Sequence, residues 1–426
     1  MSSSDSLVVR YPGTVLDGRA IRTRSLLTIV LVFLFAANVY DPGGALRLKY
    51  AAIILLCASA IQTLKYFDLS SLEVIGGMLL FVIWPCWALL LGAARKGDMA
   101  VAVTQVTPFL FALPLALLLP AVDRRTPLRL FYACLFSLAI FVVVSFGLVF
   151  LMPDSAVGSK VFEVLSSLQE QEGYFGPERM GDVTVPVLYF RSTLFLVPAC
   201  VYFLFMGRVW RAGITFLALG LAWSKSGMFI ALVFGLVFLV LKLTSRADSS
   251  GGPTSSAIRP TIFKIILPVI LLSGIVLLIV SSFPGFFDII LDTAVGESDT
   301  ALVRIGHYHS IMDLFARHPD YLLIGQGAGT SFFSSGASDY VRIIELAHLD
   351  GIRKFGLPWF LGFSMLVFYS SWRLIKTKEM EARGFGFALV SMYIAGGTNP
   401  VLFTPLFIIL LTLCYFAQRP RLEISS

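Results

Sequence analysis

The sequence carries little charge. Only 14% of its 426 residues are Asp, Glu, Lys or Arg, whereas 57% are apolar, and the mean hydropathy is +0.84. This composition excludes an ordinary soluble globular domain. The formal net charge of +7 could indicate a nucleic-acid partner, but the basic residues cluster in short segments beside apolar runs, so we expect none. The sequence predicts an integral membrane protein in contact with membrane lipids.

Cysteine is also scarce. The five cysteines lie within apolar runs and lack the paired spacing of zinc ligands: Cys57, Cys86, Cys134, Cys200 and Cys414. We therefore expect no disulfide, no metal and no cofactor. Basic residues precede the apolar run 26–40, but no small-residue cleavage site follows it, so this run is predicted to be a retained first span.

Long apolar runs, in contrast, are abundant. A spanning helix needs about 20 apolar residues, and shorter runs are tolerated among other helices. Twelve runs fit this rule, near 25–40, 50–64, 72–94, 101–122, 130–152, 187–206, 212–224, 227–243, 262–282, 357–372, 385–398 and 401–417. Lys and Arg concentrate in alternate connecting segments, which places both termini in the cytoplasm. Arg95 and Lys96 are exceptions to this rule.

The expected fold class is an all-α polytopic membrane protein in three parts. Residues 1–282 hold spans 1–9 and an outer segment near 153–186, in which residues 159–172 are predicted to form a short interfacial helix. Residues 283–356 form a large, mainly helical loop on the outer side, between spans 9 and 10. Residues 357–426 hold spans 10–12 and a cytoplasmic tail, and segment 246–259 has the composition of a flexible linker.

All four histidines fall in this large loop, at His307, His309, His318 and His348. A membrane-type chain that confines its imidazoles to one loop is predicted to place its chemistry there. Arg304, His307 and Tyr308 would share one helix face, where the guanidinium could hold an anionic group such as phosphate. The alternative is a solvated loop helix with local pairs.

Two further patterns lie in the same loop. Glu345 and His348 are three residues apart, with Asp350 and Arg353 following, and a carboxylate that orients an imidazole is a familiar acid/base arrangement. The alternative is an amphipathic helix whose polar face happens to carry these groups. The Gly-rich segment 325–329 fits no nucleotide-binding motif and is predicted to be a tight turn that lets its backbone approach a ligand or a neighbouring helix.

Two basic residues are predicted near the membrane edge. Arg191 stands at the start of the sixth span, and Lys225 lies between two short apolar runs. Ionisable residues at this depth are costly and indicate a function, unless they extend to lipid headgroups. Together, the cations and the acid/base candidates suit a lipid-linked pyrophosphate substrate, whose leaving-group charge Arg and Lys could stabilise without a metal.

The order of these motifs resembles that of the O-antigen polymerase and O-antigen ligase superfamily. The matches are the turn Ser224–Gly227, the run from Arg304 through His318 to Gly327, the loop histidine His348 followed by Gly356, and a large loop before the tenth span. The resemblance covers the chain from Arg191 onward. Lys225 stands where the family's turn has Arg, and Leu349 and the short gap to Gly356 favour a polymerase over a ligase.

The resemblance implies a metal-independent glycosyltransferase on the periplasmic face of the bacterial inner membrane. A growing glycan on undecaprenyl pyrophosphate would be transferred to a sugar hydroxyl of another lipid-linked repeat unit, with a chain-length regulator as a further partner. By analogy with the family, Arg191, Lys225 and Arg304 would hold the pyrophosphate, and Tyr308 and Arg353 are further candidates for substrate binding. The candidate catalytic residues are Arg304, Glu345 and His348. His348 or Glu345 would activate the acceptor hydroxyl.

Two alternatives remain. One is an O-antigen ligase, which transfers the glycan to lipid A core. The other is a membrane transporter or flippase, although such proteins are expected to carry ionisable residues in mid-span and repeated halves, and the sequence shows neither.

Overall fold

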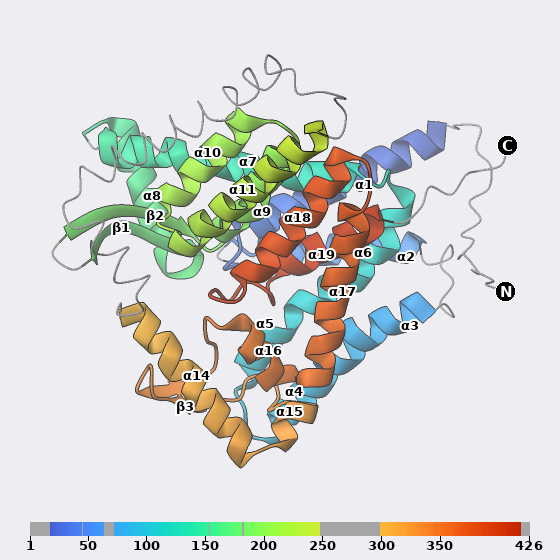
Figure 1. Cartoon of the computed structure of the whole chain (residues 1–426), viewed down its shortest axis with the longest axis vertical. Coiled ribbons are helices and arrows are strands. Elements are labelled where there is room, and N and C mark those ends of the chain that lie inside the picture. Colours follow the sequence, from blue (N-terminus) through green and yellow to red (C-terminus); the bar gives the residue numbers. More distant parts are fainter. Residues whose placement is uncertain are drawn as a thin grey trace.

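The structure is a computed structural model that describes residues 18–44, 46–63, 72–152, 154–180, 183–247 and 299–418 (Figure 1). The predicted ninth span, most of the linker 246–259 and the start of the large loop lie outside these residues. Within them the chain is mostly helical, as the sequence predicts.

The helices before the large loop follow the apolar runs. They are α1 (Gly18–Tyr40), α2 (Leu48–Thr63), α3 (Leu72–Met78), α4 (Trp84–Ala94), α5 (Met99–Val106), α6 (Ala112–Leu118), α7 (Thr126–Phe146), α9 (Leu196–Phe205), α10 (Val209–Leu221) and α11 (Lys225–Ala247). After the loop come α17 (Leu357–Ile375), α18 (Met380–Ala395) and α19 (Pro405–Ala417).

Prolines mark where two helices change their winding. A π-helical turn, Leu79–Ile83, joins α3 to α4 immediately before Pro85, and a 3₁₀ turn, Thr107–Phe111, joins α5 to α6 around Pro108. Proline has no N–H to donate and its ring crowds the preceding turn, so the hydrogen-bond pattern must shift there. Because the chain stays helical through both turns, each pair of helices forms one continuous apolar segment, Val74–Ala94 and Met99–Leu118.

Four helical segments are long and apolar enough to cross a membrane: Val74–Ala94, Met99–Leu118, Thr126–Phe150 and Lys225–Lys242. Five shorter apolar helices accompany them in the described residues, and the predicted count of twelve spans is not confirmed. Large apolar side chains on these helices face outward, such as Phe229, Leu232 and Leu236 on α11. A surface of this kind suits contact with lipid rather than with water.

A few short strands accompany the helices of this predominantly helical chain, and the longest two lie before and at the start of the sixth predicted span. The short helix predicted within 159–172 is observed as α8 (Ala156–Glu172), but it leads into an antiparallel hairpin, β1 (Gly173–Met180) and β2 (Val183–Phe190). The sequence of β2 is rich in β-branched and aromatic residues, which favour extended backbone. The sixth predicted span therefore begins as a strand, and its helix starts only near Leu196.

The bundle is centred on α19, α9 and α18. Every side of α19 is apolar and nearly all of it is buried, as expected for a helix enclosed by others. Between α7, α9 and α18 the rings of Tyr132, Tyr202 and Phe385 stack, with centroids 4.2 Å apart for the two tyrosines and 4.9 Å apart for Tyr202 and Phe385. The helices α4 and α17, at the edge of this bundle, carry the large loop.

The described part of the large loop is α14 (Asp299–Arg317), α15 (Asp320–Ile324), the hairpin β3 (Phe332–Ser334) and β4 (Asp339–Val341), and α16 (Ala347–Phe355). It has a small core of its own, formed by Ile311, Phe315, Phe332 and Ile344. Figure 1 shows α14, α15, β3 and α16 gathered at one end of the molecule.

The Gly-rich turn fastens this loop to the α4–α5 turn, which confirms the predicted close backbone approach. Gly325, Gly327 and Gly329 have φ of 80°, 98° and 75°. Ala328 N–H donates to Ala88 O at 2.8 Å, and Asp98 N–H donates to Gly329 O at 3.0 Å. Only glycine combines positive φ with room for this contact.

The same contact explains the exceptional position of Arg95. Its guanidinium donates to Gly325 O at 2.6 Å, lies 3.3 Å from the Asp320 carboxylate and stacks over the Tyr321 ring at 4.4 Å. Because the loop compensates the charge of Arg95, this residue does not need to follow the charge bias of the connecting segments.

Candidate functional site

An ion pair between Arg304 and Glu345 joins α14 to the segment just before α16. Arg304 donates from Nε to Glu345 Oε2 at 2.7 Å, and its Nη2 lies 2.6 Å from the same oxygen. Both side chains are partly exposed, at 28% and 47%. Since a guanidinium has five N–H donors, this pair leaves Arg304 oriented and still able to bind an anion.

The end of strand β2 lies near this pair. Tyr189 is half-buried, and burial raises the pKa of its hydroxyl; the nearby charge of Arg191 lowers that pKa, and the charge of Glu345 raises it. Tyr189 therefore stands within electrostatic range of both groups. Arg191 follows β2 directly and is exposed. The hairpin thus brings Tyr189, two residues before Arg191, within electrostatic range of Glu345.

His348 lies at the start of α16, against the end of α18. Its ring centroid is 4.7 Å from that of Tyr393 and 5.8 Å from that of Phe360. Burial lowers the pKa of His348, and a hydrogen bond with the Tyr393 backbone partly opposes this. Its Nε2 is buried and finds no hydrogen-bond partner among the described residues. A neutral imidazole with one unpaired nitrogen is what a proton acceptor requires.

Glu345 and His348 are not arranged as their spacing predicts. Helix α16 begins only at Ala347, so the two residues do not share a helix face. The carboxylate of Glu345 binds Arg304, while His348 faces Tyr393 and Gly397. Glu345 therefore contacts a guanidinium rather than the imidazole that the sequence predicts.

The turn between α10 and α11 carries Lys225 and an unusual backbone. Trp223 N–H donates to Gly220 O and Ser224 N–H donates to Leu219 O, which is the pattern that closes a helix with a left-handed residue. Glycine normally takes that position, yet here it is Trp223, with φ of 55°. A bulky residue keeps this strained backbone conformation only when its surroundings hold it there. Such residues are often found at functional sites.

The turn between α18 and α19 contacts both the segment that follows Lys225 and the start of α16, which carries His348. Asn399 donates from Nδ2 to the Ser226 hydroxyl at 3.0 Å. In the same turn, Gly396 O accepts from Ala347 N–H at 3.1 Å, and a Cβ at Gly397 would lie 3.7 Å from the His348 ring. The Lys225 turn and the start of α16 therefore meet the same short segment.

Two other candidates, His307 and Tyr308, lie on α14 outside this cluster. His307 is on α14 as predicted, but it is buried, and its Nδ1 is 2.5 Å from the Ser334 hydroxyl. Burial lowers the pKa of His307, although Glu345 and Asp350 act in the opposite direction. Tyr308 is 47% exposed on the other side of the helix, so the predicted shared face of Arg304, His307 and Tyr308 is divided between core and surface.

Arg353 has a structural position rather than the predicted substrate-binding one. It is completely buried. Its three nitrogens donate to the Asp350 carboxylate, the Gln326 side chain, and the backbone oxygens of Thr330 and Arg342. With its guanidinium occupied in this way, Arg353 holds the Gly-rich turn and α16 together.

Asn399, Tyr189 and Tyr393 belong to the site but were not predicted. One signal for Asn399 is available in the sequence, because Gly396–Pro400 is a polar turn between the last two apolar runs, and the alternation of spans puts it on the same side as the large loop. Nothing comparable marks the two tyrosines. In the described ranges, no group of His, Cys, Asp or Glu residues has an arrangement that could hold a metal ion.

These features define a class: a mostly helical protein with segments able to cross a membrane and a polar loop at one end of the bundle, which contains cations and an imidazole with one unpaired nitrogen. No family model, curated protein or solved structure matches the chain.

Proposed function

We propose that the protein is a polysaccharide polymerase, a metal-independent glycosyltransferase of the O-antigen type. The observation that carries this proposal is the convergence of five separate segments, which contain Arg191, Lys225, Arg304, Glu345 and His348, around the turn 396–400 and the Arg304–Glu345 pair. Cations from distant parts of the sequence, beside an imidazole with one unpaired nitrogen, suit a donor with a pyrophosphate leaving group and an acceptor hydroxyl.

In the proposed reaction the donor is a growing glycan on undecaprenyl pyrophosphate. The acceptor hydroxyl oxygen of another lipid-linked repeat unit forms a bond to the anomeric carbon, and the bond from that carbon to the pyrophosphate oxygen breaks. The hydroxyl proton passes to Nε2 of His348. The electron pair leaves with the pyrophosphate, whose negative charge Arg191, Lys225 and Arg304 stabilise.

The Arg304–Glu345 pair has a specific part in this scheme. Glu345 fixes one edge of the guanidinium, and the remaining donors meet the phosphate oxygens. Orienting the cation before the reaction avoids reorganising it as charge develops on the leaving group. Glu345 is thereby a positioning residue, and His348 is the better candidate for the base.

The proposal also includes a location. The protein would lie in the bacterial inner membrane with both termini in the cytoplasm, so that the large loop meets lipid-linked substrates in the periplasm. A separate chain-length regulator would act on the same protein.

The test is a reaction of the purified protein with undecaprenyl-pyrophosphate-linked repeat units, with and without a chelator. The expected result is a ladder of products that survives chelation and is lost in His348→Ala and Arg304→Ala. His309→Ala is the matched control, because His309 is exposed on α14 and lies outside the cluster. Both variants are expected to remain at normal levels in the membrane.

Other outcomes would overturn the proposal. Products that form only when lipid A core is supplied would show a ligase. No reaction with either acceptor would favour a transporter or flippase. A ladder that persists in Arg304→Ala would remove the role assigned to this cation.

A further inference from the structure

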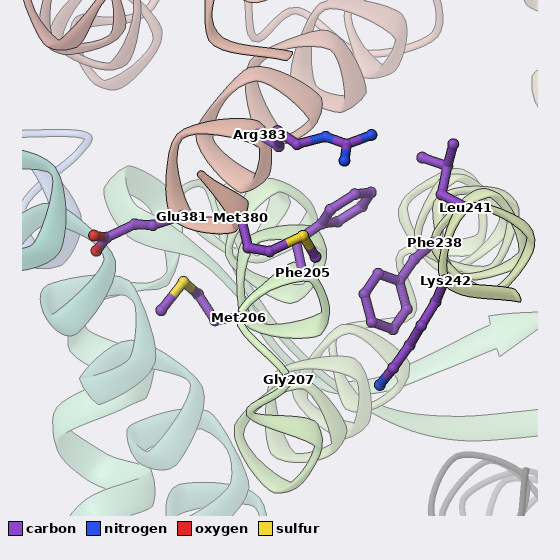
Figure 2. Close-up of a pocket in the computed structure, with 9 residues that line it drawn as sticks. All are labelled: Phe205, Met206, Gly207, Phe238, Leu241, Lys242, Met380, Glu381 and Arg383. Carbon is purple, nitrogen blue, oxygen red and sulfur yellow. The ribbon is translucent and has the colours of Figure 1, made fainter. Parts of the chain in front are cut away.

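A cavity of about 300 Å³ opens between α9, α11 and α18, far from the candidate site. Its lining residues are Phe205, Met206, Gly207, Phe238, Leu241, Lys242, Met380, Glu381 and Arg383 (Figure 2). The helix α11 begins at Lys225 beside the candidate site and reaches Lys242 about 25 Å further along at 1.5 Å per residue. Similarly, α18 runs from Met380 at the cavity to Tyr393 beside His348.

The cavity lies at the level where these helices would leave the membrane. One apolar segment long enough to cross a bilayer ends at Lys242, and another begins at Thr126, just before Arg129, which contacts the rim residue Glu381. At the end of α17, Lys376 lies over the Trp372 ring at 4.3 Å, a pairing that suits the headgroup region. Lipid phosphates occupy this depth.

The charges around the cavity favour an anion. Figure 2 shows Arg383 extending from α18 toward α11, Lys242 extending from α11 toward Gly207, and Glu381 directed away from them. The Glu381 carboxylate is already engaged by Arg129 at 2.5 Å and 2.6 Å and by Arg125 at 3.7 Å. It therefore does not neutralise Arg383, which keeps its positive charge beside the cavity.

Arg383 provides an independent indication of a ligand. Its Nε is buried and has no hydrogen-bond partner within the described ranges. Buried donors are almost always paired, because leaving one unpaired costs free energy. The Nη groups at the tip of the same guanidinium, which Figure 2 shows extended toward α11, can donate to a phosphate oxygen in the cavity.

The apolar lining distinguishes a lipid from a free ion. Phe205, Met206, Phe238 and Met380 contribute large apolar side chains beside the two cations. An inorganic phosphate gains nothing from such surfaces, whereas the glycerol and the first acyl carbons of a phospholipid can pack on them. The volume admits a headgroup, and the outward apolar side chains of α11, such as Leu236 and Val240, can accompany the acyl chains.

We propose that this cavity binds the phosphate of an anionic phospholipid headgroup, with Arg383 and Lys242 as the cations that meet it. The lipid joins α9, α11 and α18 at the end opposite the candidate site. Since the same three helices frame that site, the bound lipid stabilises the bundle on which the site is built. The proposal stands independently of the polymerase function.

Thermal unfolding of the purified full-length protein in mixed micelles tests this. Titration with phosphatidylglycerol should raise the melting temperature, while phosphatidylcholine should raise it far less. Arg383→Ala and Lys242→Ala should each weaken the apparent affinity for phosphatidylglycerol about fivefold, as expected for one basic residue at a lipid surface. Lys378→Ala is the matched control, because this exposed lysine is in the adjacent turn but does not line the cavity.

Three results would overturn the proposal: equal stabilisation by both lipids, an unchanged affinity in the Arg383→Ala/Lys242→Ala double variant, or stabilisation by inorganic phosphate that phosphatidylglycerol does not reproduce. The last result would assign the site to a soluble phosphate. If the alanine variants do not fold, native mass spectrometry of the wild type in an equal mixture of the two lipids decides, since a lack of preference for phosphatidylglycerol would refute the site.

Discussion

At the scale of single residues, the loop contains two kinds of ion pair. Arg304 and Glu345 form a partly exposed pair, whose charges remain accessible to a ligand. Asp350, Arg353 and Lys354 form a buried group, in which one carboxylate meets two cations and burial lowers the pKa of Lys354 to about 8. The exposed pair can contact a ligand. The buried group stabilises the fold, because a buried charge must keep its partners.

The buried group predicts a large effect of a small change. Asp350→Asn leaves Arg353 and Lys354 without their carboxylate, and we expect it to reduce the free energy of unfolding by about 3 to 5 kcal/mol. Asp320→Asn, the matched control, breaks the more exposed pair with Arg95 and should cost about 0 to 1 kcal/mol. Denaturant unfolding in detergent measures both, and equal losses would contradict the assignment.

His348 predicts the pH dependence of the proposed reaction. Burial disfavours the charged imidazolium, so the pKa is below the usual value of about 6.5 and the neutral base persists to lower pH. The rate should therefore fall only as the pH drops through a midpoint below about 6.5. Initial rates of product formation across the acidic range measure this midpoint. A midpoint above that value would contradict the environment found for His348, and His309→Ala should leave the profile unchanged.

At the scale of elements, the Gly-rich turn decides where the loop sits. Its backbone lies directly against that of α4 and the following turn, and a Cβ at Gly327 would be 2.4 Å from Gly92 N. On the other side, Trp84 Nε1 donates to Phe355 O, and the rings of Phe355, Trp359 and Phe109 pack together. These two contacts hold α16, and thus His348, against the bundle.

Substituting one glycine tests this attachment. Gly327→Ala must accommodate both a positive φ of 98° and a backbone overlap, so we expect a loss of about 2 to 4 kcal/mol in the free energy of unfolding. Gly77→Ala, within α3, has no atom within 4 Å of the new Cβ and should be neutral or slightly stabilising. Thermal unfolding of both variants makes the comparison; similar midpoints would show that the turn does not fasten the loop.

At the scale of the whole molecule, apolar composition and membrane crossing are different properties. Helices α9 and α19 are short, strongly apolar and buried within the protein. An apolar run reports that a segment avoids water, but it does not tell whether lipid or protein surrounds it. Counting such runs predicts twelve spans, and the described residues contain four segments that are long and apolar enough to cross a membrane and five shorter apolar helices.

The sidedness of the molecule is a prediction that labelling can test. In a variant without the native cysteines, Ala337→Cys in the large loop should react with a membrane-impermeant maleimide in intact spheroplasts. Lys378→Cys, in the basic turn between α17 and α18, should react only after permeabilisation. Both positions are exposed. Reaction of Lys378→Cys in intact spheroplasts would reverse the predicted orientation.

Sequence by itself determined the local and compositional features. The apolar runs predict most of the described helices, the polar interval predicts a separate loop unit, and the spacing of glycines predicts the close turn at 325–329. The sequence does not predict the hairpin β1–β2. Its first strand lies in the polar segment 153–186, and the end of its second strand belongs to the apolar run 187–206, which was interpreted as the sixth span. Each of these features depends on residues close in the chain.

Tertiary structure alone decided the partners of the charged and polar groups. Arg304 and Arg353 look alike in sequence, yet one is a partly exposed cation beside Glu345 and the other is wholly buried against Asp350 and Gln326. Asn399 reaches Ser226 only because α18, α19 and α11 pack together. Such pairings join residues far apart in the chain, so their outcome depends on how helices pack and not on local spacing.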